Sequence, residues 1–421
     1  MTITRRQFIK SSLAVAPAAA LMPTVFTRAV AAAANKQVSA GNRTLVIVQM
    51  AGGNDGLNTI VPANDGRYYD LRPTVNVQQD DALPINSEVG FHPSLFAFKQ
   101  LFDEGVLGAV EGVGYPGPSY SHFESMDIWQ TADPKESGRF EGWMGRYLEG
   151  LPPRKSDQIQ SLAVGKRLPV ELRTASMAVP IVNTVGKYKL QPDPKAKLDQ
   201  GKRTEALLKL YRTTASSRPF GEHLDSTITA AEGSAKTIQD AHERYTSTVN
   251  YPDTKLGRHL QVVAEAIIGG AGPSVAHVRI GGFDTHASQL PEHAELLRDT
   301  ADSMLAFYRD MQAHGRDQDV VMMTWSEFGR RVNENGSGGT DHGSAGPMFV
   351  LGTPVTGGLY GERSSLTDLA GTKNRKNFKY TTDFRQVYAT MIEGWLGAPA
   401  ELVLGGRFEQ IPFLRSGAVA N

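Results

Sequence analysis

The chain has 421 residues, and its 44 basic and 44 acidic side chains give a formal net charge of zero. This balance argues against bulk electrostatic binding to nucleic acid, which requires a basic excess. With 40% hydrophobic and 21% charged residues, the composition is that of a globular protein, not of a disordered or polytopic membrane protein. The absence of cysteine excludes disulfides, thiolate metal sites and a cysteine nucleophile, so any bound metal needs oxygen and imidazole ligands.

Residues 1–34 have the composition of an export signal. Arg5 and Arg6 form a twin-arginine pair, followed by the mild apolar stretch SSLAVAPAAALMPTV and the small-residue run AVAAAA. This three-part plan is typical of signals for the twin-arginine route. A short membrane anchor is the alternative, but the apolar stretch is short, alanine-rich and interrupted by proline. We therefore expect the twin-arginine export machinery as a partner, a periplasmic or secreted location, and no integral membrane segment.

Apolar runs rich in β-branched residues alternate with helical patterns along residues 40–415. The expected strands are Thr44–Met50, Leu107–Gly114, Ser161–Gly165, Val275–Ile280, Asp319–Ser326 and Met348–Gly352. The expected helices are Ser94–Phe102, Ser121–Thr131, Leu256–Ile268, Pro291–Ala313 and Asp383–Leu396. Such alternation predicts an α/β fold with a doubly wound, mainly parallel sheet and helices on both faces. Within this domain, the polar stretch Lys187–Tyr251 has helical patterns but no clear strand, and we expect a helical insertion or cap there.

The first polar cluster, Gly52–Gly56, directly follows the strand expected at Thr44–Met50. Ligands of open α/β sheets bind beyond the carboxyl ends of the strands. Asp55 would project there as a hard oxygen ligand for a metal, next to glycines that let the backbone turn sharply. The alternative is a plain Asx turn, because Asn-Asp-Gly is a common turn sequence.

Ser121 and His122 open the helix that is expected after strand Leu107–Gly114. A hydroxyl group at a helix N-terminus lies in a positive local field, where a metal can deprotonate it for attack on phosphorus or sulfur. The alternative is a structural cap, in which Ser121 and Glu124 form a capping box. The functional interpretation makes Ser121 the nucleophile and His122 a group that holds the anion.

Asp284 and His286 follow strand Val275–Ile280 in the string GGFDTH. Because they are two residues apart in an extended segment, their side chains point the same way and can bind one cation. His293, in the helix that follows, is a weaker candidate ligand. The alternative is a turn in which Asp284 caps that helix.

Glu327 follows strand Asp319–Ser326, and Asp341 and His342 lie in a glycine-rich loop before the last strand. Taken alone, this loop is equally consistent with a mobile polar segment. Arg330 can neutralise an anionic substrate through its bidentate fork. Together, the clusters offer enough carboxylates and imidazoles for two divalent ions, which can clamp the attacking and leaving oxygens of an in-line displacement.

Five sequence motifs follow the twin-arginine signal along the chain: GGNDGLNTIVP, SHFESMDIWQTA, GGFDTH, SEFGR and GGTDHG. They resemble the bacterial secreted family known as domain of unknown function number 1501, over residues 40–415. That family is grouped with the alkaline phosphatase superfamily, which includes sulfatases and cofactor-independent phosphoglycerate mutases. The resemblance implies an alkaline phosphatase-like fold with a two-metal site.

The order of the superfamily's ligands along the chain implies two metal positions. One metal would be bound by Asp55, Ser121 and Glu327, and the other by Asp284, His286 and His342. Phe328 stands where the superfamily has a histidine ligand, so Asp341 or His122 would have to replace it. An oxygen-rich site of this kind favours Mg, Mn or Ca over Zn.

Two functions are consistent with this pattern. The first is a secreted metal-dependent hydrolase of phosphate or sulfate esters, in which Ser121 attacks a small anionic ester and the metals polarise it. No sulfatase-type Cys-x-Pro-x-Arg or Ser-x-Pro-x-Arg string surrounds Ser121, which argues against a formylglycine nucleophile. The second is a catalytically degenerate periplasmic binding or assembly protein on the same fold, which the substituted position Phe328 favours.

Overall fold

The computed structural model describes the chain from residue 43 to residue 418, with gaps at 136–137, 153–157, 186–187, most of 189–220, 373–374 and 417. The expected signal at 1–34 therefore lies outside the described residues, as does much of the expected insertion. From that insertion, the helix α9 (Gly221–Arg244) is described.

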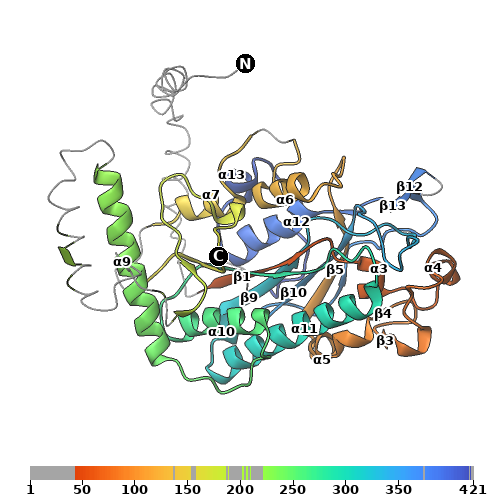
Figure 1. The fold of residues 1–421 in the computed structure, drawn as a ribbon, viewed down its shortest axis with the longest axis horizontal. Coiled ribbons are helices and arrows are strands. Elements are labelled where there is room, and N and C mark those ends of the chain that lie inside the picture. Colours follow the sequence, from red (N-terminus) through yellow and green to blue (C-terminus); the bar gives the residue numbers. More distant parts are fainter. Residues whose placement is uncertain are drawn as a thin grey trace, which may run out of the picture. The chain divides into compact units, whose positions relative to one another are not determined.

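A nine-stranded mixed sheet forms the centre of the fold (Figure 1). Its strands are β1 (Thr44–Ala51), β5 (Leu107–Gly114), β6 (Ser161–Val164), β7 (Ile181–Val182), β8 (Val275–Gly281), β9 (Val320–Trp325), β10 (Gly346–Leu351), β11 (Gly358–Tyr360) and β14 (Thr382–Asp383). The strand order is β11-β5-β10-β9-β1-β8-β6-β7, and β14 also pairs with β5. All eight residues of β1 are buried, as expected for a parallel strand that is covered on both faces.

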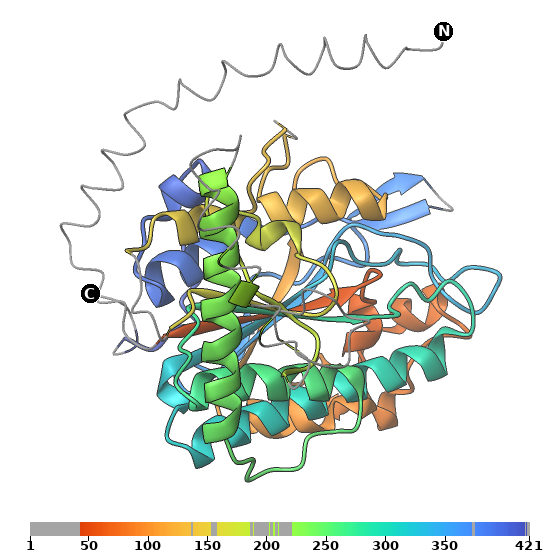
Figure 2. The same cartoon turned by 60° about the vertical axis from the view of Figure 1, so that its left-hand side comes forward.

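Helices cover both faces of the sheet (Figures 1 and 2). Val46 and Val48 of β1 pack into a core with α5 (Phe96–Asp103), α9, α10 (Lys255–Ile268) and α11 (Gln289–Ala313). Leu45 and Ile47, whose side chains point the other way, pack with α6 (His122–Thr131), α7 (Trp143–Glu149), α12 (Phe384–Ala389) and α13 (Ala400–Leu404). This alternation along one strand produces the two helical layers of a doubly wound α/β fold.

Strand β10 runs antiparallel to both of its neighbours, β5 and β9, whereas the other pairings in the sheet are parallel. Its first residue, Gly346, therefore lies at the same edge as the carboxyl ends of β1, β8 and β9. As a consequence, the loop before β10, which carries Asp341 and His342, meets the loops that follow those three strands.

The fold agrees with the predicted mainly parallel α/β class, and all six expected strands are present. The expected helix Asp383–Leu396 is α12 followed by a π-helical segment, Thr390–Trp395. Two small sheets lie outside the central one: β2 (Ile60–Val61), β4 (Gly90–Phe91) and β3 (Leu83–Pro84) form the first, and β12 (Leu369–Thr372) and β13 (Arg375–Phe378) form the second. The short helices α3 (Gly56–Thr59) and α4 (Gly66–Leu71) follow β1 in the chain. Among the described helices, none has the length and apolar character needed to cross a bilayer.

Candidate metal centre

The candidate site lies where the loops after β1 and β8 touch. Gly52 has a φ of +126°, and a Cβ atom there would lie 2.4 Å from the backbone nitrogen of Asp284. Only glycine tolerates both the positive φ and this close approach. The glycines after β1 therefore let the loop that carries Asp284 pack directly on the end of the central strand.

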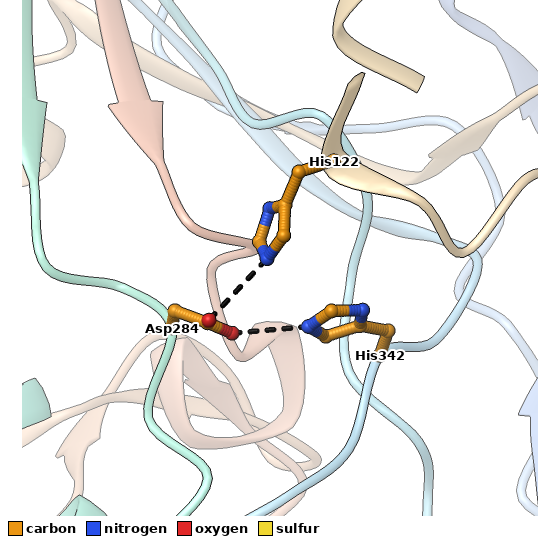
Figure 3. A group of neighbouring side chains, drawn as sticks. All are labelled: His122, Asp284 and His342. Carbon is orange, nitrogen blue, oxygen red and sulfur yellow. Dashed lines mark hydrogen bonds and ion pairs between the residues drawn. The ribbon is translucent and has the colours of Figure 1, made fainter. Parts of the chain in front are cut away.

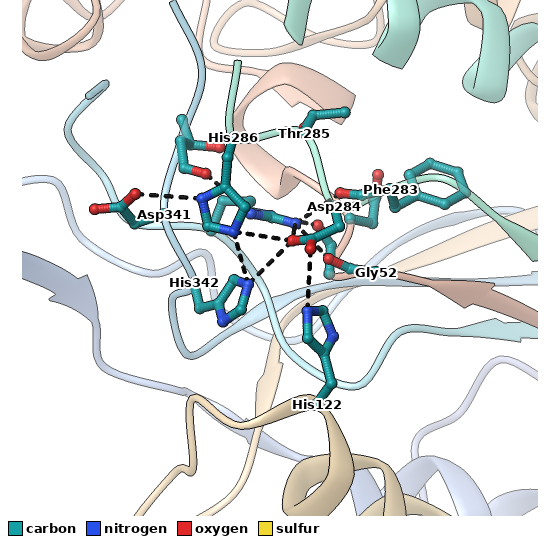
Figure 4. A network of polar contacts seen from close by, with 12 residues as sticks. Gly52, His122, Phe283, Asp284, Thr285, His286, Asp341 and His342 are labelled. Atoms are coloured by element: carbon teal, nitrogen blue, oxygen red, sulfur yellow. Dashed lines mark hydrogen bonds and ion pairs between the residues drawn. The ribbon is translucent and has the colours of Figure 1, made fainter. Parts of the chain in front are cut away.

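Three imidazoles converge on the carboxylate of Asp284 (Figures 3 and 4). The Nε2 atoms of His286 and His342 each lie 3.0 Å from Asp284 Oδ1, and they lie 2.9 Å from one another. The Nε2 atom of His122 lies 3.3 Å from Asp284 Oδ2. We call these four side chains the histidine cluster, and they come from the start of α6, the loop after β8 and the loop before β10.

Each imidazole of the cluster uses its other nitrogen, Nδ1, to bond an oxygen atom that can only accept a hydrogen bond. The Nδ1–H groups are therefore donors, and in the neutral form of each ring the lone pair is on Nε2, which faces Asp284. This places three lone pairs and a carboxylate around one point, which is the arrangement of a metal site with its outer hydrogen bonds in place. The bonds run from His342 to the Tyr120 carbonyl (2.7 Å), from His122 to Glu327 (2.9 Å) and from His286 to Asp341 (3.3 Å).

The charges around the cluster favour an ionised Asp284 carboxylate. Burial opposes ionisation, but a hydrogen bond from Arg330 and the adjacent His342 imidazole hold the pKa of Asp284 well below its usual range. The hydrogen bond to Glu327 raises the pKa of His122, and burial lowers the pKa of His342. The cluster therefore offers an anionic oxygen beside imidazoles, and ligand atoms of His122, Asp284 and His342 all lie within 4.8 Å of one another, close enough to hold one cation.

The predicted ligands Glu327 and Asp341 lie behind the histidines. Glu327 Oε1 accepts the backbone N–H of Gly52 at 2.8 Å as well as the imidazole of His122, and Glu327 is buried. Asp341 accepts hydrogen bonds from Asn335 (3.2 Å) and Arg331 (2.9 Å) in addition to His286. Both carboxylates thus orient imidazoles in this structure and do not join the ring of atoms around Asp284.

Asp55 is the predicted ligand that lies apart from the cluster. Its Oδ2 atom accepts Arg72 Nη1 at 2.6 Å and also a hydrogen bond from Gln289, and both members of the ion pair are buried. Burial opposes ionisation, but Arg72 keeps the pKa of Asp55 below its usual value. The weaker candidate ligand His293 is also buried and is not part of the histidine cluster; its Nε2 atom lies 2.9 Å from Asn54 Oδ1. Within the described chain, no hydrogen bond joins Asp55 directly to a histidine of the cluster.

Arg330 is buried at the strand ends and does not face solvent. The residue is 1% exposed, and its side chain donates to four backbone carbonyl groups and to Asp284 Oδ1 at 2.8 Å. The carbonyls belong to Gly52, Gly53 (2.7 Å), Phe283 (2.7 Å) and Thr340 (2.9 Å). A guanidinium that is held in this way cannot turn outward to bind a substrate, so the predicted direct contact of Arg330 with an anion does not fit this geometry.

Ser121 is exposed at the N-terminus of α6. It lies between Tyr120, whose carbonyl group bonds His342, and the cluster residue His122. The capping box with Glu124 that we considered does not form, because in the described chain Ser121 makes no side-chain capping hydrogen bond. Instead, Ser119 Oγ donates to Glu124 at 2.6 Å and accepts the backbone N–H of Ser121 at 3.1 Å. The Ser121 hydroxyl is therefore not consumed by the cap.

Phe328, at the substituted position, packs against the cluster. Its ring centroid lies 4.5 Å from that of His342 and 4.9 Å from that of His122, and the side chain is buried. The ring forms an apolar wall that limits water on this side of the imidazoles. No sequence pattern indicates two other residues, Arg72 and Gln289, because only their positions in the fold connect them with Asp55.

The comparisons with known proteins give one family and several structural likenesses. The solved structures that resemble this chain include PsFucS1 sulfatase from Pseudoalteromonas sp. (12% identity, TM-score 0.37, 95% of this chain and 78% of that chain covered). They also include the lipoteichoic acid synthase LtaP from Listeria monocytogenes (9%, 0.32, 74% and 66%) and Ps i-CgsB in complex with k-i-k-neocarrahexaose (9%, 0.33, 87% and 73%). At these TM-scores, the fold assignment rests on the strand order and helix layers described above. Among curated proteins, none matches the sequence. A family model described as "Protein of unknown function (DUF1501)" matches residues 107–394.

Proposed function

Because this chain belongs to the family described as "Protein of unknown function (DUF1501)", we propose its function from the site itself: metal-dependent hydrolysis of a phosphate or sulfate ester. One observation carries the proposal. Three imidazole Nε2 atoms point at one carboxylate while their Nδ1–H groups are all bound to oxygen. Lone pairs that face one another at such distances repel unless a cation lies among them.

The residues that would hold the metal are Asp284, His122, His286 and His342. Three nitrogens and one oxygen form a nitrogen-rich set, which suits Zn or another transition metal better than Mg or Ca. We therefore revise the preference drawn from the sequence, which assumed an oxygen-rich site. When bound, such a metal polarises an ester oxygen and lowers the pKa of a hydroxyl group near it.

Ser121 is the nucleophile in this proposal. It lies at the N-terminus of α6, its hydroxyl is free of the cap, and the next residue is the cluster histidine His122. The helix terminus stabilises negative charge on the attacking oxygen and on a bound anion. The substrate class is a small anionic ester, and the twin-arginine signal implies that the reaction takes place in the periplasm or outside the cell.

The test is hydrolysis of p-nitrophenyl phosphate and p-nitrophenyl sulfate by the full-length protein, reconstituted in turn with Zn, Mn, Co, Mg and Ca. Ser121→Ala should lose several orders of magnitude in kcat with unchanged metal content, because the attacking oxygen is gone. Ser365→Ala, which removes an exposed serine from the loop before β12, is the matched control and should keep wild-type turnover.

The alternative is a catalytically degenerate binding or assembly protein of the periplasm. A folded, metal-loaded wild type that hydrolyses neither ester, together with unchanged function of Ser121→Ala in the host, would favour this alternative. Turnover by the wild type that Ser121→Ala abolishes would exclude it.

A further inference from the structure

The sequence suggests a site for two metal ions, and the structure offers ligands for one. The second position would have to be built from Asp55, Ser121 and Glu327. Asp55 Oδ2 accepts from Arg72 and Gln289, and Glu327 Oε1 accepts from the Gly52 N–H and contacts His122. The other oxygens, Asp55 Oδ1 and Glu327 Oε2, are buried without a hydrogen-bond partner, but neither residue belongs to a group of three convergent ligands in the described chain. Phe328 supplies no ligand atom. Among the described residues, no second set of convergent nitrogen or oxygen ligands accompanies the histidine cluster.

A positive charge already lies among these groups. The guanidinium of Arg330 is buried between the ends of β1 and β8, where it donates to three carbonyl groups from their loops, to the Thr340 carbonyl and to Asp284. Oxygen atoms of this kind and density are the usual surroundings of a hard cation. In this chain the guanidinium group of Arg330, which is always positively charged, occupies the position among these oxygen atoms.

The net charge of the side chains around the cluster also favours one ion over two. Around the cluster, the carboxylates of Asp284, Glu327 and Asp341 face the guanidinium groups of Arg330 and Arg331. Asp55 and Arg72 neutralise each other. Three negative and two positive groups leave one net negative charge, which one divalent ion converts to one net positive charge. A second divalent ion would raise it to three in a partly buried site, at a large cost in electrostatic free energy.

We propose that this centre binds one metal ion, with His122 among its ligands beside Asp284 and His342, and that Arg330 takes the place of the second ion. The inference rests on the proposed metal-dependent function and goes beyond it by fixing the number of ions. Arg330 is a positioning residue here, because it acts on the metal through the oxygen atom of Asp284 that it bonds. The resulting single positive charge suits an anionic ester as substrate.

The first test is the number of ions bound by the full-length protein. Native mass spectrometry and a Co²⁺ titration followed by visible absorption should both give one equivalent for the wild type. Two equivalents would overturn the inference and leave the hydrolase standing. No bound metal, by contrast, would remove the proposed function itself, so the two failures are distinguishable.

Asp55→Asn is the matched variant that separates one ion from two. It removes the charge of a residue that a two-metal site requires, while the amide oxygen can still accept from Arg72. We expect the metal count to stay at one, and a loss of one equivalent would overturn the inference. His122→Gln should weaken binding of the single ion by about tenfold or more, as loss of a ligand or its outer partner does. Unchanged affinity would show that His122 is not a ligand.

Substitution of Arg330 tests the charge apart from the packing. Arg330→Gln removes a positive charge that repels the ion, so the Co²⁺ affinity should rise, by about tenfold or more, although the variant is less stable. Arg330→Lys keeps the charge and should restore an affinity near that of the wild type. A purely structural role predicts the opposite sign for Arg330→Gln, and weaker binding by that folded variant would overturn the role of Arg330. If Arg330→Gln does not fold, the counts for the wild type and Asp55→Asn still decide the number of ions.

Discussion

Glu171 is a buried carboxyl group with an unusual partner. It lies in the short helical turn Val170–Leu172, and its Oε1 atom lies 3.1 Å from His277 Nε2 in β8. Burial raises the pKa of Glu171 to about 8 and lowers the pKa of His277 to about 3. The folded chain therefore keeps one proton on this pair, on the carboxyl group of Glu171, and His277 stays neutral. No local sequence pattern indicates this pair, because Glu171 and His277 lie far apart along the chain.

We expect the pair to make the protein less stable as pH rises from about 6.5 to about 8. In that range the unfolded chain holds no proton on either group, whereas the folded chain still holds one. The free energy of unfolding should fall by about 1.4 kcal/mol per pH unit, or about 2 kcal/mol in total. Between about pH 4.5 and 6.5 both states hold one proton, so the pair contributes no slope there.

Urea denaturation of the wild type and of Glu171→Gln across this pH range measures the effect. The variant carries no ionisable group at this position and keeps the size of the Glu171 side chain. The difference in stability between the two proteins should therefore change by about 2 kcal/mol between pH 6.5 and 8. Two parallel pH profiles would contradict the assignment of a shared proton.

At the scale of elements, Arg72 connects three segments that meet at the carboxyl edge of the sheet. It directly follows α4, bonds Asp55 after β1, and donates to the carbonyl groups of Arg331 (2.8 Å) and Val332 (2.9 Å) after β9. Through Gln289, the same network reaches the hydroxyl groups of Thr285 and Thr340, next to cluster residues. Asp55 thus supports the loops that carry the ligands.

Asp55→Ala should destabilise the protein by about 3–5 kcal/mol, because it leaves the buried Arg72 guanidinium without its counter-ion. Asp65→Ala is the matched control: it breaks a pair with Arg67 that is exposed to solvent, and it should cost about 1 kcal/mol. The measurement is the free energy of unfolding in urea for the metal-free proteins. Similar losses in the two variants would show that the Asp55–Arg72 pair has no special weight.

The sequence predicted the central elements because their signals are local. The apolar run of β1 predicts a strand that is buried on both faces, and this prediction needs no information about the neighbouring strands. The direction of β10 has no such signal, and neither do two-residue strands such as β2 and β3. The antiparallel course of β10 is nevertheless what places His342 at the site.

At the scale of the molecule, the four proposed ligands join segments that lie far apart in the sequence. His122 starts α6, Asp284 and His286 follow β8, and His342 precedes β10. A metal that binds this set binds the folded chain and not the unfolded chain. Its binding free energy therefore adds to the stability of the whole domain.

Metal loading should raise the free energy of unfolding by about 2.7 kcal/mol when the free ion is present at about a hundred times its Kd. Differential scanning calorimetry of the chelated and the reloaded protein measures this gain as a higher Tm. Asp284→Asn, which removes the anionic ligand, should gain much less from the same ion. An equal shift in both proteins would place the stabilising ion elsewhere.

The sequence predicts which strand ends form the site, but it does not show which of their side chains are metal ligands and which orient the ligands. Asp284, His286 and His342 meet because all three lie at one edge of the sheet, which follows from the fold class. Whether Asp55 or His122 joins them depends on Arg72, which pairs with Asp55, and on Glu327, which orients His122, and no local sequence pattern indicates these contacts between distant parts of the chain.

The most direct measurement is anomalous X-ray diffraction, at the absorption edge of the bound metal, from crystals of the loaded protein. The account predicts one anomalous peak, surrounded by the Nε2 atoms of His122, His286 and His342 and by the carboxylate of Asp284. A peak bound by Asp55 and Glu327, two peaks, or none at this edge of the sheet would contradict it.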